Sequence, residues 1–140
     1  MSALQPRADL LAGMTEAALQ RQVEALLDAT GWSHWHAPDN RPVTPRSGRR
    51  YVQAVKPGWP DLVATRGPVL LALELKTQTG RVTPEQAAWL LRLQATGAQV
   101  AVIRPADVQW LAIALAPRRA GYLGAGRVLP VFETRLVPEP

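Results

Sequence analysis

The sequence predicts a single α/β domain in which α-helices flank a mixed central β-sheet. The chain has 140 residues, a length that suits one domain with its own hydrophobic core. Its apolar residues change between helical and strand spacing in the order helix, strand, two hairpin strands, helix, strand, helix. Such an order of elements is typical of α/β domains with a mixed sheet.

The first helix is predicted from about Glu16 to Ala29. Apolar side chains recur there every three or four residues, Thr15 precedes the segment as an N-cap, and Gly31 follows as a terminator. Residues 1–13 show no period, and we expect a flexible N-terminus there. The alternating aromatic stretch WSHWHAP after Gly31 predicts a strand.

A β-hairpin is predicted between Asp61 and Lys76. Its first strand starts at Asp61, once Pro60 has set the direction of the chain, and the turn RGP ends it. The strongly apolar run VLLALELK then forms the second strand. Two apolar runs joined by a short Gly-Pro turn are typical of a hairpin.

The second half of the domain is predicted to add a helix, a strand and a short helix. Thr83 and Pro84 are suitable as N-cap and first helical residue, and the helix runs to Gly97. QVAVIR then predicts a buried strand, and PADVQWLAIAL a short helix. We expect the domain to cover residues 14–116, with 117–140 as an extension that packs on the domain or lies at a dimer interface.

Composition excludes several classes of protein. The chain has no cysteine, so disulfides, thiolate catalysis and cysteine zinc sites are excluded, and a reducing cytoplasm is the expected location. Its apolar runs are too short to cross a membrane, and the first residues lack a basic stretch followed by an apolar core, so we expect no secretion signal. Sixteen basic against eleven acidic side chains give a net charge of +5. This surplus favours a nucleic-acid partner, although a GC-rich genome alone also raises arginine content.

Basic residues concentrate in the segment 41–56, RPVTPRSGRRYVQAVK, which contains no acid. Its Pro, Ser and Gly residues favour an extended, mobile loop. Arginine pairs with phosphate oxygens through two hydrogen bonds, so this loop is a candidate clamp on a nucleic-acid backbone; a solvated loop that touches nothing is the alternative. The candidate contacts are Arg41, Arg46, Arg49, Arg50 and Lys56.

The hairpin brings two carboxyl groups and one ammonium group together. Side chains alternate along a strand, so Glu74 and Lys76 share one face and the intervening leucines share the other, which belongs to the core. A turn at residues 66–68 places Asp61 opposite the end that carries Glu74 and Lys76. We therefore predict that the three side chains converge at one edge of the sheet.

This arrangement suits metal-dependent hydrolysis of a phosphodiester bond. Two carboxylates offer hard oxygen ligands to Mg²⁺, which keeps positions open for water and phosphate. A nearby lysine offsets negative charge in the transition state. Each residue alone has a structural explanation, because Glu-Lys pairs often form weak surface ion pairs and an Asp after Pro is often a turn residue. The three residues at this spacing favour the functional interpretation.

An ordered set of residues between 58 and 105 extends beyond this triad. The set comprises Pro60-Asp61, the triplet Glu74-Leu75-Lys76, then Gly80, Thr83, Gln86 and Trp89, and finally Gly97 and the strand VAVIR. It resembles the VRR-NUC branch of the PD-(D/E)XK nuclease superfamily, with the triplet as the (D/E)XK element. The triplet alone is unspecific, but the ordered set is fairly specific. The resemblance spans most of residues 14–112 and implies a restriction-endonuclease-like core.

The resemblance also implies roles for individual residues. Asp61 and Glu74 would bind the metal, helped by the Leu75 carbonyl, and Lys76 would assist the nucleophile. Such nucleases commonly take a further acid from the first helix. Glu16 is the best match and Glu24 the competitor.

Further residues near the predicted site have ordinary explanations as well. An acid in a first helical turn, such as Glu16, also complements the helix dipole. Gln86 matches a recurrent glutamine near the site, although a glutamine on a helix surface needs no function. Trp59, beside Asp61, could stack on a nucleotide base, whereas core packing is the usual role of such a residue.

Together these observations predict an Mg²⁺- or Mn²⁺-dependent endodeoxyribonuclease. Compact relatives include junction-resolving and phage-type nucleases, so branched or flapped DNA is the expected substrate by analogy. A homodimer is one arrangement that would place two sites on two strands. Two alternatives stay open: a nuclease-like module that binds nucleic acid without cleaving it, and an interaction protein whose arginines reflect genome composition alone.

Overall fold

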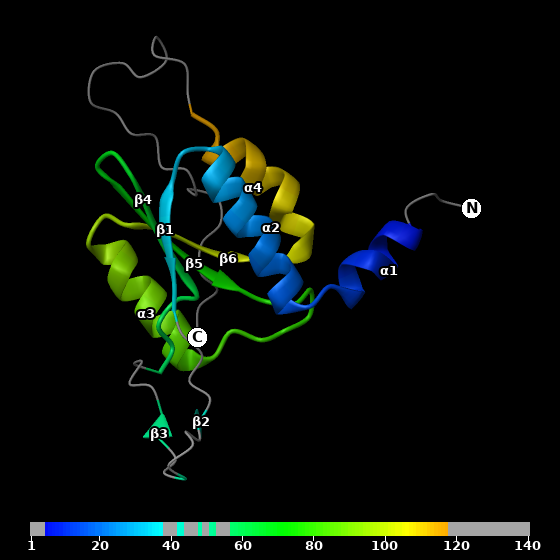
Figure 1. Cartoon of the computed structure of the whole chain (residues 1–140), viewed down its shortest axis with the longest axis horizontal. Helices are drawn as coiled ribbons and strands as arrows, with labels where there is room; N and C mark the ends of the chain where they lie inside the picture. The colour runs from blue at the N-terminus through cyan, green and yellow to red at the C-terminus, as the bar shows by residue number, and fades with distance from the viewer. Residues whose placement is uncertain (1–4, 38–41, 44–47, 49–50, 53–56, 118–140) are drawn as a thin grey trace.

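The computed structural model describes residues 5–37, 42–43, 48, 51–52 and 57–117 (Figure 1). At its centre is a four-stranded sheet with the order β1-β4-β5-β6. The pairs β1/β4 and β4/β5 are antiparallel and the pair β5/β6 is parallel, so the sheet is mixed as predicted. The strands are Ser33–His36 (β1), Leu62–Arg66 (β4), Val69–Leu75 (β5) and Gln99–Ile103 (β6).

Helices cover the two faces of this sheet (Figure 1). On one face, α2 (Glu16–Ala29) and α4 (Val108–Leu115) pack on β5 through a cluster of buried leucines that includes Leu71, Leu73 and Leu75. On the other face, α3 (Pro84–Ala95) packs Ala87 and Leu90 on Ala72 and Val100. The sheet is therefore the middle layer of a three-layer α/β domain.

The elements that border the site form where the sequence predicts them. The Thr15 hydroxyl accepts the backbone N–H of Ala18 at 3.1 Å and starts α2, and Gly31 follows its end with a φ of +81°. Gly67, with a φ of +55°, makes the tight turn of the β4–β5 hairpin. The pairing of Leu62 with Leu73 then brings Asp61 to the end of β5 that carries Glu74.

Three local features differ from the sequence-based expectation. A helix, α1 (Gln5–Gly13), forms where no element is predicted, since its apolar residues follow no helical period. Within the predicted basic loop, β2 (Pro42–Val43) and β3 (Tyr51–Val52) form a two-stranded antiparallel ladder. A 3₁₀ turn, η1 (Pro105–Asp107), precedes the last helix. The predicted extension lies outside the described residues from 118 onward.

No helix in the described parts of the chain is long and apolar enough to span a membrane.

The connection into β4 packs very closely on the first turn of α3. Gly58 has a φ of +84°, and a Cβ atom there would lie 2.5 Å from the carbonyl carbon of Glu85. The Trp89 indole N–H also donates to the Pro57 carbonyl at 3.1 Å. Because only glycine permits this contact, Gly58 fixes the position of the loop that leads to Asp61.

We expect Gly58→Ala to destabilise the protein more than Gly97→Ala does. Gly97 also has a positive φ, +93°, but open space surrounds its missing Cβ. Gly97→Ala should therefore cost only the left-handed backbone, about 1 to 2 kcal/mol. Gly58→Ala adds the overlap with Glu85, about 1 to 3 kcal/mol more. Urea unfolding of both variants measures the difference, and equal losses would contradict the close packing.

Candidate active site

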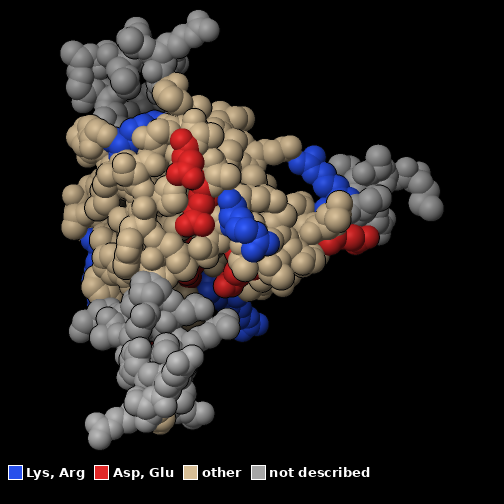
Figure 2. Space-filling model, viewed as in Figure 1, with Lys and Arg blue, Asp and Glu red and all other residues tan. Residues whose placement is uncertain are grey.

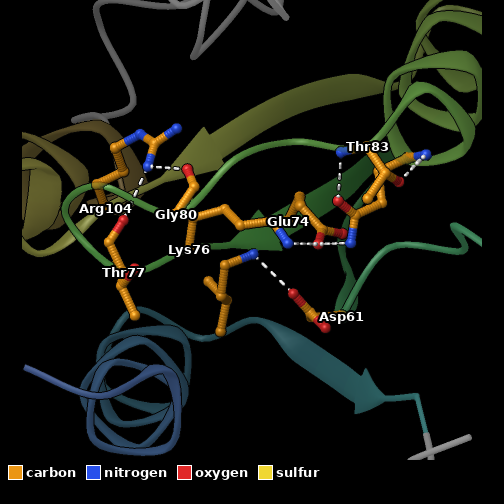
Figure 3. A network of polar contacts seen from close by, with 9 residues as sticks. Asp61, Glu74, Lys76, Thr77, Gly80, Thr83 and Arg104 are labelled. Carbon is orange, nitrogen blue, oxygen red and sulfur yellow. Dashed lines mark hydrogen bonds and ion pairs between the residues drawn. The ribbon is translucent and has the colours of Figure 1, made fainter.

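The three predicted site residues lie together at the end of β5 (Figure 3). Asp61 directly precedes β4, Glu74 is the penultimate residue of β5, and Lys76 directly follows that strand. Glu74 is 1% exposed and Lys76 is 9% exposed, so both charged groups are buried. The predicted convergence is confirmed, but the burial exceeds what a position at a sheet edge suggests.

Asp61 is anchored to the backbone of the neighbouring strand. One of its carboxylate oxygens, Oδ2, accepts the Leu75 backbone N–H at 2.7 Å. This hydrogen bond holds the carboxylate beside Glu74, where its negative charge acts on the second carboxyl group. Leu75 thus contributes its amide to the site, while its side chain lies in the leucine core.

The Glu74 carboxyl group is only partly satisfied. Its Oε1 atom accepts the Gln86 side-chain amide at 2.7 Å and lies 3.5 Å from Lys76 Nζ. Its Oε2 atom is buried and, among the described residues, has no hydrogen-bond partner. Burial and the nearby charge of Asp61 raise the pKa of Glu74 to about 8, against the opposing effect of Lys76.

Gln86 is aimed at Glu74 by the N-terminal cap of α3. The Thr83 hydroxyl accepts the Gln86 backbone N–H at 3.2 Å, and the Gln86 side-chain oxygen accepts the Thr83 backbone N–H at 2.9 Å. This reciprocal capping box occupies the oxygen of the Gln86 amide, so its nitrogen faces Glu74. The predicted position of Gln86 beside the site is therefore explained by the start of the helix.

Arg104 holds the loop that follows Lys76, a role that sequence reasoning missed. Its Nη1 atom donates to the carbonyls of Thr77 at 2.8 Å and Gly80 at 2.7 Å (Figure 3). Arg104 follows the last residue of β6, so the parallel strand beside β5 organises the loop. The position of an arginine at the end of a buried strand was the only hint of this role in the sequence. Its carbonyl partners lie 27 and 24 residues away in the chain, so the sequence does not reveal them.

The residues present fit a divalent cation. Two neighbouring carboxylates, one with a buried oxygen that lacks a partner, form a site that a cation would stabilise because it offsets both the repulsion and the desolvation. Mg²⁺ is usually bound by one or two carboxylates and several waters. Among the described residues, no group of three or more His, Asp or Glu side chains is arranged so that it could hold a metal ion.

The two candidate acids of the first helix have different surroundings. Glu24 lies 3.9 Å from His34 Nδ1 and accepts the Gln20 side-chain amide at 3.5 Å, so it belongs to a polar cluster between α2 and β1. Glu16 is exposed in the first turn of α2, a helix that packs against β5. No described contact joins either acid to Glu74.

Acidic and basic side chains are mixed on the exposed surface of α2 (Figure 2). They include Glu16, Arg21 and Asp28. The described residues carry seven basic and eight acidic side chains in all, and the other nine basic and three acidic residues lie outside the described ranges. The latter include all five candidate backbone contacts, namely Arg41, Arg46, Arg49, Arg50 and Lys56. The basic surplus of the chain is therefore outside the described body.

A mixed four-stranded sheet flanked by helices is consistent with the restriction-endonuclease-like core of the PD-(D/E)XK-like nuclease group. The family model of the VRR-NUC domain matches residues 13–107, and the chain belongs to this family. Nucleases of this kind generally use divalent metal ions. No curated protein and no solved structure matches the chain.

We expect the metal-free protein to lose stability as the pH rises from 5 to 8, and Glu74→Gln to remove this loss. The folded pKa of Glu74, about 8, lies above its ordinary value of 4.5. In this range the folded state keeps a proton that the unfolded state releases, so rising pH favours unfolding by up to about 1.4 kcal/mol per pH unit. Denaturant unfolding in EDTA measures both profiles. Parallel profiles would contradict the assignment.

Arg104→Lys should lower stability by about 1 to 3 kcal/mol, because it removes charged guanidinium hydrogen bonds to half-buried carbonyls. Amide hydrogen exchange at residues 77–80 should accelerate in the same variant. Arg92→Lys, an exposed change on α3, is the control and should stay within about 0.5 kcal/mol of wild type. Unchanged exchange in the loop would show that Arg104 does not hold it.

Proposed function

We propose that this nuclease hydrolyses DNA phosphodiester bonds internally, with Mg²⁺ or Mn²⁺ and with Asp61, Glu74 and Lys76 as catalytic residues. The single observation that supports this proposal best is the buried Glu74 carboxyl group. One of its oxygens has no partner in the parts of the chain that the structure describes, and the group lies between a second carboxylate and a lysine. A purely structural glutamate would be satisfied by its neighbours or exposed to water.

Asp61 and Glu74 would hold the metal ion, and the Leu75 carbonyl is the third candidate ligand. When bound, the ion supplies a polarised phosphoryl oxygen and a water of lowered pKa. The hydrogen bond from the Leu75 amide fixes Asp61, and the hydrogen bond from Gln86 fixes Glu74. Both carboxylates are thus held in place by groups on rigid elements before substrate arrives.

Lys76 provides the positive charge of the site. Its ammonium group lies 3.5 Å from Glu74 Oε1 and can donate its other hydrogens to the attacking water or to a phosphate oxygen. In the reaction the water oxygen forms a bond to phosphorus, the bond from phosphorus to the 3′ oxygen breaks, and that oxygen takes a proton. The products are a 5′-phosphate and a 3′-hydroxyl. Lys76 offsets the negative charge that grows on the phosphate during this step.

The proposal gives supporting roles to residues further away. Glu16 is favoured over Glu24 as an additional acid, because Glu24 already contacts His34 and Gln20. The segment from Arg41 to Lys56 would contact the DNA backbone, and its charge supports this role since the described body has no basic surplus. The nuclease domain would cover residues 14–116, and branched or flapped DNA is the proposed substrate.

Wild-type protein with Mn²⁺ should cut at least one of a panel of linear, flapped and four-way-junction DNAs. Lys76→Ala and Asp61→Asn should reduce the rate at least about 100-fold, the usual loss when one charged group of a preorganised site is removed. Calorimetric titration should show that Asp61→Asn also loses Mn²⁺ binding. Arg21→Ala, an exposed change on α2, should keep wild-type activity.

Two outcomes would contradict the proposal. Equal residual cutting by wild type and Lys76→Ala would assign the activity to a contaminant. DNA binding without cutting by any variant would instead support a nucleic-acid-binding module.

A further inference from the structure

A pocket of about 280 Å³ lies beside α3. Its lining combines an aromatic ring, a cation, an acid and small apolar surfaces: Pro57, Pro84, Glu85, Ala88, Trp89 and Arg92. The α3 members are three or four residues apart and form one stripe along the helix, while Ala87 and Leu90 face the core. The triad at the end of β5 does not include any of these residues.

The Trp89 ring is held rigidly in this pocket. Its indole N–H already donates to the Pro57 carbonyl at 3.1 Å. The Trp59 ring packs against it edge to face, with 5.1 Å between ring centroids and 76° between ring planes. The Arg92 guanidinium lies 5.5 Å from the ring centroid. With its polar atom satisfied, the half-buried ring has aromatic surface left for a ligand.

Both walls of the pocket belong to segments that also carry or contact residues of the candidate active site. Glu85 is adjacent in sequence to Gln86, whose side chain binds Glu74. The Pro57 wall continues through Trp59 to Asp61, and Gly58 presses this wall onto the first turn of α3. Arg92 lies seven residues beyond Glu85, or about 10 Å further along the helix axis. The pocket therefore extends along α3 and is built on the same two segments that lead to Asp61 and hold Glu74 through Gln86.

We propose that this pocket binds one unpaired nucleobase of the DNA strand, next to the phosphate that is cut. A single base suits the volume, which is at the small end of ligand pockets. The Trp89 ring offers a stacking surface, and Arg92 offers a cation for the base or for the next phosphate. The Glu85 carboxylate can accept a hydrogen bond from an exocyclic amino group, which adenine, cytosine and guanine have and thymine lacks.

This inference rests on the proposed function and gives it a substrate class. A base inside a continuous duplex is stacked on both sides and cannot enter a pocket without being flipped out, whereas the first unpaired base of a flap, tail or branch is already accessible. The pocket thus accounts for a preference for DNA with unpaired nucleotides over blunt duplex, with an amino-bearing base preferred to thymine.

The test compares binding of a blunt duplex with binding of the same duplex carrying a six-nucleotide tail of cytosines or of thymines. Fluorescence anisotropy in EDTA measures affinity without any cleavage. The variant Ala88→Phe fills the pocket without removing a polar contact, and Ala95→Phe adds the same bulk at an exposed position of α3 outside the pocket. Arg92→Ala, a change at an exposed position of the pocket lining, is the second variant.

We expect wild type to bind the cytosine-tailed duplex more tightly than the blunt duplex. Ala88→Phe should lower the affinity for the cytosine-tailed duplex about 5- to 100-fold, which is the range for one base stacked on an aromatic ring. Arg92→Ala should lose part of it, and Ala95→Phe should keep it. Glu85→Gln should reduce the preference for the cytosine over the thymine tail.

Equal affinity of wild type for tailed and blunt duplex would overturn the inference, as would tail binding that neither Ala88→Phe nor Arg92→Ala weakens. Cleavage with Mn²⁺ is measured separately. Tail binding that depends on Ala88 and Arg92, in a protein that cuts no DNA, would support the pocket and reject the proposed catalysis. Normal cutting with unchanged binding in both variants would reject the pocket alone.

Discussion

The placement of a carboxyl group inside the domain, at Glu74, is the constraint on which the rest of the site depends. Burying a carboxyl group is costly unless partners compensate for the lost water. Here the compensation is incomplete: Gln86 and Lys76 approach one oxygen, Asp61 adds repulsion, and the second oxygen has no partner among the described residues. The raised pKa of Glu74 expresses this imbalance. A site of this kind is disfavoured when empty and charged, and a bound cation would relieve the repulsion and the desolvation.

The surrounding fold keeps this unfavourable group in position. On one face of β5, leucines pack against α2 and α4 and fix the strand, which leaves the opposite face to carry Ala72 and Glu74 toward α3. The capping box that starts α3 also orients Gln86, so a single turn of helix both begins the element and holds the Glu74 carboxyl group. Arg104 completes the support by tying the carbonyls of the 77–80 loop to the end of β6.

The surplus of basic side chains and the candidate site residues lie in different parts of the chain. The described body has almost equal numbers of acidic and basic side chains, and the surplus of arginine and lysine lies outside the described ranges. Long-range attraction of a polyanion would therefore come from those segments, whereas the described body supplies the carboxylates, the lysine and the aromatic pocket beside α3. In the proposed function, affinity for the DNA backbone and selection of an unpaired base would thus reside in different parts of the chain.

The sequence by itself determined the order of the main elements, the hairpin and the convergence of Asp61, Glu74 and Lys76, because strand alternation and turn chemistry are local properties. It also identified the family through motif spacing, and it placed Thr83 and Gln86 at the start of a helix.

Local periodicity shows the face on which a residue lies, but not how deeply the face is covered. Only the tertiary structure decided that Glu74 is buried with an oxygen left over, that Arg104 reaches the loop after Lys76, and that Trp59 and Trp89 meet beside α3. Each of these depends on contacts between elements distant in sequence, and packing alone sets those contacts.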